Sequence, residues 1–268
     1  MNKLLVILSL ILVASCSPNE VAFDTLNLRQ GVFYEVNSQK PFTGVSNEYH
    51  VNGQLKINRN YEEGKLEGLS QAYHENGQLS NNVYYKNGKK DGLSKSYFET
   101  GQLSSNIYYK DGKLDGLFES YYENGQLKYG INYKDGIQDG LSMIYQESGQ
   151  LKSKGNYKTG KEQGLHEQYY ENGKLEIRKN YKDGEIDGLY QVYYENGNIH
   201  YQHAQKDGIQ DGLFEVYYEN GQIRLKGNKK EGQDDGLWTN YNEDGTLRRK
   251  VCYQNGDNIF YDLSVCEK

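Results

Sequence analysis

The chain has 268 residues, 35% of them hydrophobic, and a formal net charge of -6. This hydrophobic content lies below the roughly 45–50% of a typical globular domain, which excludes a thick buried core, while 27 Tyr and 7 Phe exclude the aromatic-poor composition of a disordered chain. Binding through a nucleic-acid backbone requires clustered Lys and Arg, so the acidic balance argues against a nucleic-acid partner.

Residues 1–15 resemble a secretory signal peptide. Lys3 precedes an apolar run from Leu4 to Val13 that is too short to span a bilayer as a mature helix. The run ends in Ala-Ser-Cys16, which resembles a bacterial lipobox, so Cys16 is the predicted lipidation site and mature N-terminus. An ordinary signal peptide with an incidental Cys is the alternative. Residues 16–31 are then a lipid-anchored tether, and we expect the protein on the periplasmic or outer face of the bacterial cell envelope.

A 24-residue period follows. One glycine series recurs without insertion or deletion, at Gly53, Gly77, Gly101, Gly125, Gly149, Gly173, Gly197, Gly221 and Gly245, and two further series, Gly64 to Gly256 and Gly44 to Gly236, keep the same step. Such repetition is typical of an array in which each unit contacts only its neighbours. The array is predicted over residues 32–262, with a C-terminal tail at 263–268.

Each unit carries the signals of a β-hairpin. Asn124-Gly125 favours a two-residue type I′ turn between strands at about 117–122 and 127–133, and a longer connection around Asp111-Gly112 leads from the previous hairpin. The predicted fold is therefore all-β: an elongated single-layer antiparallel sheet of about nine 24-residue hairpins, or about eighteen strands.

Two residue ladders are expected along this sheet. Alternation places Leu117, Glu119 and Tyr121 on one face and Phe118, Ser120 and Tyr122 on the other. The Leu position runs from Leu69 to Leu237 and the Tyr position from Tyr49 to Tyr241, and the Tyr ladder is expected to hold the single layer together. The tyrosines of the other face remain candidate contacts for a partner: Tyr122, Tyr170, Tyr194 and Tyr218.

The unit Gly-Leu-x-x-x-Tyr-Tyr-Glu-Asn-Gly-Gln-Leu followed by Tyr-Lys-Asp-Gly-x-x-Asp-Gly resembles the bacterial variant of the MORN repeat (membrane occupation and recognition nexus), in the group often labelled YwqK-type antitoxins. The resemblance covers residues 32–262, and Lys40-Pro41-Phe42-Thr43-Gly44 resembles the start of such arrays. It implies an elongated sheet of hairpins that is used for binding, and it associates the chain with antitoxins.

Repeated charges line the margins of the predicted sheet. Acidic residues precede the second glycine of most units, as at Asp115 and Asp139, and a calcium site is the alternative to a turn-forming role. Successive copies are about 10 Å apart, too far to share one ion, so no metal is expected. A Glu row from Glu75 to Glu243 is expected to be a solvated edge, with a cationic partner as the alternative.

No catalytic motif or cofactor site stands out, and a group repeated nine times is not a unique catalyst, so no enzyme activity is expected. The leading hypothesis is a non-catalytic scaffold that binds an unknown protein partner. The alternatives are a toxin-neutralising antitoxin or immunity protein, and a polysaccharide-binding module that uses exposed aromatics such as Trp238, Tyr190 and Tyr218.

Aromatic bulk suggests where a partner binds. Phe118, His166, Tyr190, Phe214 and Trp238 share one register and grow larger toward the C-terminus. The predicted partner site therefore lies over repeats six to nine and comprises His166, Tyr170, Tyr190, Tyr194, Phe214, Tyr218 and Trp238. Cys252 and Cys266 form a possible disulfide that closes a loop near the C-terminus, with two unpaired thiols as the alternative.

Overall fold

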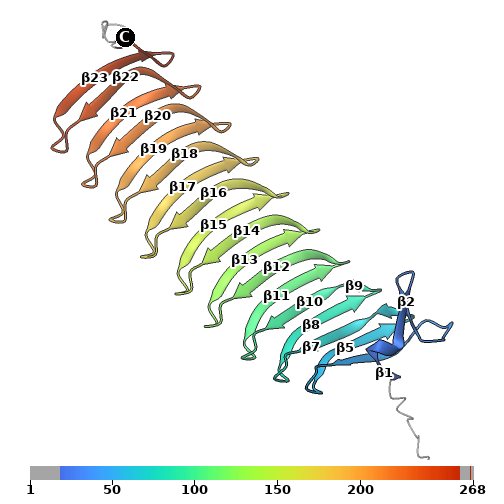
Figure 1. The fold of residues 1–268 in the computed structure, drawn as a ribbon. Coiled ribbons are helices and arrows are strands. Elements are labelled where there is room, and N and C mark those ends of the chain that lie inside the picture. The colour runs from blue at the N-terminus through green and yellow to red at the C-terminus, as the bar shows by residue number, and fades with distance from the viewer. Residues whose placement is uncertain (1–18, 260–265, 267–268) are drawn as a thin grey trace, which may run out of the picture.

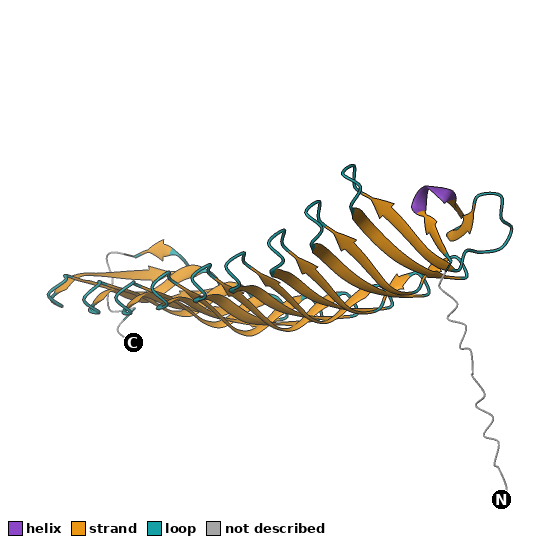
Figure 2. Cartoon of the chain, turned by 90° about the horizontal axis from the view of Figure 1, so that it is seen from below, coloured by secondary structure: helices purple, strands orange, loops and turns teal. Residues whose placement is uncertain are grey.

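The computed structural model describes residues 19–259 and 266. Hairpins follow one another in chain order from the N-terminus to the C-terminus and form one twisted, elongated sheet (Figures 1 and 2). Over the described residues this sheet has 22 strands, and its long strands pair antiparallel. The predicted elongated all-β repeat fold is confirmed. The predicted signal peptide and lipidation site, at residues 1–16, lie outside the described residues.

Nine hairpins make up the described array. They pair β4 (Gly44–Tyr49) with β5 (Leu55–Glu62), β7 (Gly68–Tyr73) with β8 (Leu79–Lys86), β10 (Gly92–Tyr97) with β11 (Leu103–Lys110), β12 (Lys113–Tyr121) with β13 (Leu127–Lys134), β14 (Ile137–Tyr145) with β15 (Leu151–Lys158), β16 (Lys161–Tyr169) with β17 (Leu175–Lys182), β18 (Glu185–Tyr193) with β19 (Ile199–Lys206), β20 (Ile209–Tyr217) with β21 (Ile223–Lys230), and β22 (Gln233–Tyr241) with β23 (Leu247–Gln254). Three two-residue strands, β6 (Lys65–Leu66), β9 (Lys89–Lys90) and β24 (Asp257–Asn258), extend these pairings.

The tight turn of each unit lies between hairpins. Asp111 and Gly112 both have positive φ, 49° and 83°, and Lys110 pairs with Lys113 across them. This is the two-residue turn whose twist matches paired strands, with both central residues left-handed.

The Asn-Gly connection has a different geometry from the one predicted. Of Asn124 and Gly125 only Gly125 has positive φ, at 86°, and the N–H of Tyr122 donates to the carbonyl of Gln126 at 2.8 Å, which leaves a three-residue loop. The Asn124 side chain accepts the N–H of Gln126 at 2.9 Å. The prediction of a type I′ turn at Asn124-Gly125 is therefore wrong, because this side-chain bond and a single left-handed glycine close a longer loop.

A small cap covers the first strand of the array. β1 (Glu20–Ala22) pairs parallel with β4, and after a 3-10 turn (Phe23–Thr25) the strands β2 (Leu26–Arg29) and β3 (Val32–Glu35) form a separate two-stranded sheet. Leu26, Phe42 and Tyr61 form a buried core beneath it. The prediction that residues 16–31 are a tether is wrong from residue 20 onward, since this segment buries apolar side chains and pairs with the edge of the array.

The other end of the array is tied by a disulfide. Cys252 on β23 is fully buried and is joined to Cys266, with their Cα atoms 6.0 Å apart. The backbone N–H of Ile259 also donates to the carbonyl of Cys252 at 2.9 Å. Ile259 and Cys266 are therefore both held against the last hairpin. Within the described residues, no helix is long and apolar enough to cross a membrane.

Candidate functional site

The predicted aromatic register forms a packed row inside the sheet surface. We call it the ring row: Phe118, His166, Tyr190, Phe214 and Trp238. His166 is 9% exposed and Trp238 only 5%. Trp238 is thus not the exposed aromatic platform that the glycan hypothesis requires, and that part of the prediction is wrong. The row contributes packing, which a single-layer sheet otherwise lacks.

Ring contacts connect successive repeats along this face. Tyr190 stacks on His203 with centroids 4.9 Å apart, His203 lies 6.0 Å from Phe214, and Phe214 lies 5.5 Å from Trp238. The distances fall in the range of favourable aromatic pairs. Burial, followed by a hydrogen bond with Tyr201, raises the pKa of Tyr190 to about 12. The first repeats have the small residues Ser46, Ser70 and Ser94 at this position. Toward the C-terminus rings occupy the same position, and they add side-chain packing that serine does not provide.

Two glycines make room for the two buried members of the row. A Cβ at Gly227 would lie 2.2 Å from the Trp238 ring, and a Cβ at Gly155 would lie 2.3 Å from the His166 ring. Neither glycine has positive φ, so the residue type is set by the ring above it and not by the backbone. This pairing was not predicted, although glycine outside the three periodic series is its signal in the sequence.

The tyrosines proposed as partner contacts link neighbouring repeats. The hydroxyls of Tyr122, Tyr170, Tyr194 and Tyr218 donate to the backbone carbonyls of Tyr145, Tyr193, Tyr217 and Tyr241 in the next hairpin, at 2.5–3.0 Å. His50 and His74 make the same contact through Nε2. These side chains remain only partly buried. Their hydroxyls are therefore committed to the array, while their ring edges still reach solvent.

On the opposite face, polar side chains pair across the strands. Glu167 is 7% exposed and accepts hydrogen bonds from Tyr169 at 2.8 Å and from Arg178 at 2.9 Å, with Lys154 Nζ 2.8 Å away. Burial alone would raise the pKa of the Glu167 carboxyl, but the hydrogen bonds from Lys154, Tyr169 and Arg178 hold it below its ordinary value. The buried carboxylate is fully paired, as a structural group must be.

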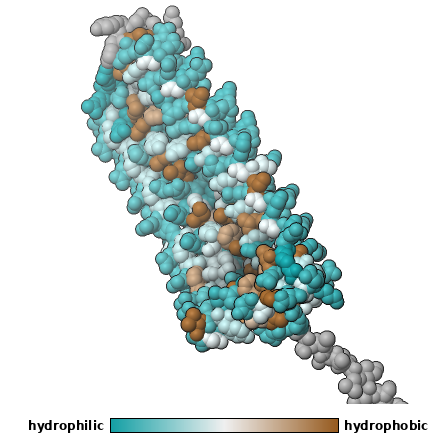
Figure 3. All heavy atoms as spheres, turned by 45° about the vertical axis from the view of Figure 1, so that its right-hand side comes forward, coloured by the Kyte–Doolittle hydropathy of each residue, from teal (hydrophilic) through white to brown (hydrophobic). Residues whose placement is uncertain are grey.

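The same face carries an exposed apolar row. We call it the Leu row: Leu117, Leu141, Leu165, Leu189 and Leu213. These side chains are 37–45% exposed. Successive members lie two strands apart, about 10 Å, so the row is about 40 Å long. Figure 3 shows hydrophobic residues recurring along the body between hydrophilic ones.

The acidic residues considered for calcium hold the turns together. Asp115 Oδ2 accepts the backbone N–H of Asp135 at 3.2 Å, and Asp139 Oδ2 accepts that of Thr159 at 3.0 Å, each in the next repeat. Gln163, the exception to the acidic pattern, accepts from Asp183 at 3.0 Å in the same way. The described residues contain no group of three or more His, Cys, Asp or Glu placed to hold a metal ion.

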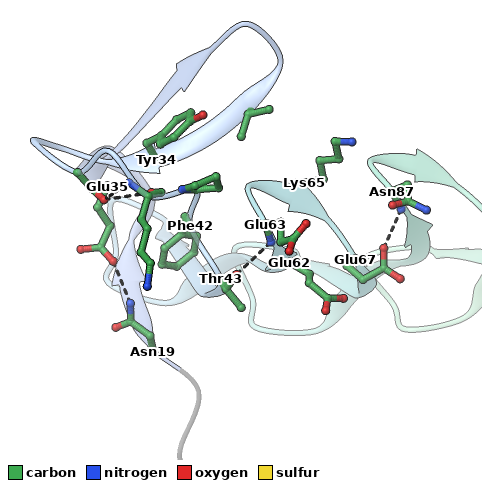
Figure 4. Close-up of a pocket in the computed structure, with 14 residues that line it drawn as sticks. Asn19, Tyr34, Glu35, Phe42, Thr43, Glu62, Glu63, Lys65, Glu67 and Asn87 are labelled. Carbon is green, nitrogen blue, oxygen red and sulfur yellow. Dashed lines mark hydrogen bonds between the residues drawn. The ribbon is translucent and has the colours of Figure 1, made fainter.

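A groove of about 1080 Å³ lies between the cap and the first repeats (Figure 4). Three contacts hold its walls. Asn19 Nδ2 donates to Glu35 at 2.9 Å, the N–H of Glu63 donates to the Thr43 hydroxyl at 3.0 Å, and the N–H of Asn87 donates to Glu67 at 2.7 Å. The first contact lies at the cap and the other two join successive turns at the start of the array, so these polar groups already have structural partners.

Comparison with known proteins identifies the repeat. The chain matches the model described as MORN repeat variant at residues 66–87, 90–111, 114–135, 138–159, 162–183, 186–204, 210–228 and 234–255. No curated protein matches the sequence.

Solved structures show only distant similarity. The chain is similar to the complex described as TcdB2-TccC3 (12% identity over 80% of this chain and 15% of that one, TM-score 0.19) and to a Photorhabdus luminescens Tc holotoxin pore (14% identity over 83% and 13%, TM-score 0.19). It is also similar to an alternansucrase in complex with isomaltononaose (18% identity over 84% and 18%, TM-score 0.20). The chain thus spans less than a fifth of the length of each of these proteins. The eight matched segments cover more than half of the sequence, and the chain belongs to the MORN repeat variant family.

Proposed function

We propose that this protein is a non-catalytic, lipid-anchored repeat scaffold that binds a protein partner at the bacterial cell envelope. The observation that carries the proposal is the Leu row, in which five apolar side chains stay 37–45% exposed in consecutive hairpins. Each exposed leucine offers an apolar contact, and the row repeats that contact at the same position of five consecutive hairpins. The regular spacing offers a partner one anchor point per repeat.

The side chains of the two sheet faces have different roles, and this difference supports the Leu row as the contact surface. His166 and Trp238 of the ring row are buried, and the hydroxyls of Tyr170, Tyr194 and Tyr218 bind the next repeat, so these groups have structural roles. The Leu row contributes less to the packing because a large part of each side chain faces solvent. It therefore replaces the aromatic register of repeats six to nine as the primary contact surface, with the ring edges of the tyrosines as secondary contacts.

The repeated polar groups support a non-catalytic role. Asp115 and Asp139 accept backbone hydrogen bonds, and Glu167 is neutralised by Arg178 and Lys154. Each of these carboxylates already has a structural partner. A general acid or base needs a proton that it can exchange with a substrate, and these groups are poorly suited to that.

The anchor is proposed from the sequence. Cys16 follows an apolar run and small residues in a lipobox-like arrangement. A Cys16→Ala variant is expected to lose incorporation of a labelled fatty acid and to leave the membrane fraction, whereas a Cys252→Ala variant keeps both. Labelling of Cys16→Ala at the wild-type level would refute lipidation at this residue.

The test of partner binding uses the full-length protein in detergent. We compare wild type with Leu165→Lys/Leu189→Lys, and use Leu28→Lys as the matched control because Leu28 is 60% exposed but lies on the cap, outside the row. Affinity capture from the cells of origin is expected to yield one stoichiometric protein with wild type and with the control, and none with the double variant. Capture that is unchanged in the double variant refutes the proposal.

The captured protein also tests the antitoxin alternative. If the partner is a toxin encoded beside this chain, and its activity is blocked by wild type but not by the double variant, the scaffold acts as an immunity protein. If the partner is an envelope protein without toxic activity, the role is assembly.

A further inference from the structure

A hollow of about 170 Å³ opens on the ring face over β14 to β17. Its lining includes Ser142, Ser153, Gly155, Tyr157, Glu162 and His166. The Leu row lies on the other face of the sheet, so a ligand here is independent of the proposed protein partner.

The hollow exists because one repeat lacks bulk where its neighbours have it. Ser142, Ser153 and Gly155 occupy three equivalent positions that hold Phe118, Tyr129 and Ile131 in the preceding repeat and His166, Ile177 and Lys179 in the following one. Within the array only this repeat has small residues at all three positions. Larger side chains on both sides of the gap then form its walls.

Two nearly buried polar side chains open into this hollow with unused hydrogen-bonding capacity. Ser142 is 8% exposed, and no hydrogen bond of its hydroxyl is present in the described part of the chain. His166 is 9% exposed, and its Nε2 lies 2.9 Å from the carbonyl of Asn156, which can only accept, so Nε2 carries the proton. In the neutral ring Nδ1 is then an acceptor, and it lies 3.8 Å from Glu162 Oε1, beyond hydrogen-bond distance. Both groups face the hollow and are free to bond a ligand there.

The charges and walls of the hollow restrict the class of that ligand. The lining carries two carboxylates, Glu162 and Glu167, and two ammonium groups, Lys154 and Lys179. These charges balance, which favours a neutral molecule. Tyr157 and His166 form an aromatic corner, with centroids 5.4 Å apart and planes at 64°. Serine hydroxyls, an imidazole acceptor and a carboxylate beside aromatic rings suit a compact molecule that carries several hydroxyl groups on an apolar ring.

The volume fits a single ring. At roughly 30 Å³ for each water, the hollow holds about six water molecules, and it is smaller than the roughly 300–1,000 Å³ of sites for larger ligands. We propose that this hollow binds one pyranose unit, either a free monosaccharide or the terminal sugar of a glycan.

The test titrates full-length protein in detergent with a panel of monosaccharides and their methyl glycosides, by isothermal calorimetry and saturation-transfer NMR. Wild type is expected to bind at least one member saturably. Ser153→Tyr, which introduces the residue of the preceding repeat, fills the hollow and is expected to abolish this binding. Ser142→Ala keeps the space and removes the unpartnered hydroxyl, and is expected to weaken binding about tenfold. The matched control is Ser105→Tyr, the same substitution two repeats earlier, which leaves binding and melting temperature unchanged.

The outcomes separate the two sources of the sugar. Equal binding of a sugar and its methyl glycoside, with the methyl group extending into solvent, identifies the terminal unit of a glycan, whereas binding of the free sugar alone identifies a monosaccharide. The proposal is overturned if no member of the panel binds, or if Ser153→Tyr and Ser142→Ala both bind as wild type does.

Discussion

The fit between Gly227 and Trp238 makes a quantitative prediction. Gly227→Ala places a methyl carbon 2.2 Å from the Trp238 ring, whereas carbon atoms in good contact lie about 3.5–4.0 Å apart. Trp238 is 5% exposed and lies between Phe214 and Tyr253, so it has little room to turn away. Overpacking of this kind costs about 1–3 kcal/mol.

The control substitution is Gly130→Ala. This glycine also lies in a strand interior without positive φ, but the nearest atom to its added Cβ is Leu117 Cδ1 at 3.8 Å, an ordinary contact. Because Ala loses less backbone entropy than Gly on folding, this variant is expected to be neutral or more stable by about 0.5–1 kcal/mol. The two variants thus make the same chemical change and should move stability in opposite directions.

Thermal and urea unfolding followed by far-UV circular dichroism measure both effects. We expect the melting temperature of Gly227→Ala to fall by about 2–4 °C for each kcal/mol lost. In a Trp238→Ser background, which restores the residue found at this position in earlier repeats, Gly227→Ala is expected to cost little, and the coupling is given by the double-mutant cycle. A Gly227→Ala protein as stable as wild type, or a cost that persists without the indole, refutes the reasoning.

Four further expectations test other contacts. Tyr194→Phe deletes the 2.9 Å bond to the carbonyl of Tyr217 and should cost about 0.5–1.5 kcal/mol in urea unfolding, whereas Tyr49→Phe, at an exposed ring, should cost less. Burial, followed by the charge of Lys229, lowers the pKa of His203, so its contribution to stability is full above its unfolded value of about 6.5 and is lost as pH falls below it. Urea unfolding across this range should show a smaller loss in His203→Phe. Reduction of the Cys252–Cys266 disulfide should remove about 3 kcal/mol of stability, which the chain-entropy model assigns to a loop of this size, and so lower the melting temperature. The melting temperature of Cys266→Ser should not respond to reductant. Millimolar calcium or a chelator should leave the melting temperature unchanged, because Asp115 and its equivalents already accept the turn N–H groups; a calcium-dependent rise would contradict this assignment.

The sequence predicted the array because its period repeats without exception. The nine hairpins and strands close to β12 and β13 follow from glycine spacing and alternation alone. The turn types did not follow, since Asn-Gly and Asp-Gly carry the same local signal and the difference lies in where the Asn124 side chain bonds. The cap at residues 20–35 was missed because it occurs once, and its strands are short and pair outside the repeat pattern.

Candidate sites were harder to predict than the fold. The larger side chains from Phe118 to Trp238 were interpreted as a binding surface. Large side chains at one register give the same sequence pattern whether they are exposed or buried. What distinguishes the two cases is the residue across the strand, and Gly227 opposite the indole indicates burial. The hollow beside His166 depends on three small residues that only the folded register brings together.

In the described array, each hairpin is held in place by contacts with the hairpins next to it. The side-chain bonds that join hairpins span 20 to 24 residues, as from Asn124 to the carbonyl of Glu147 and from Asp135 to Asp115. An interior segment of 24 residues can therefore be removed or duplicated with the joining contacts re-formed on each side. The length of the sheet can therefore change in whole steps of about 10 Å without redesign of the fold.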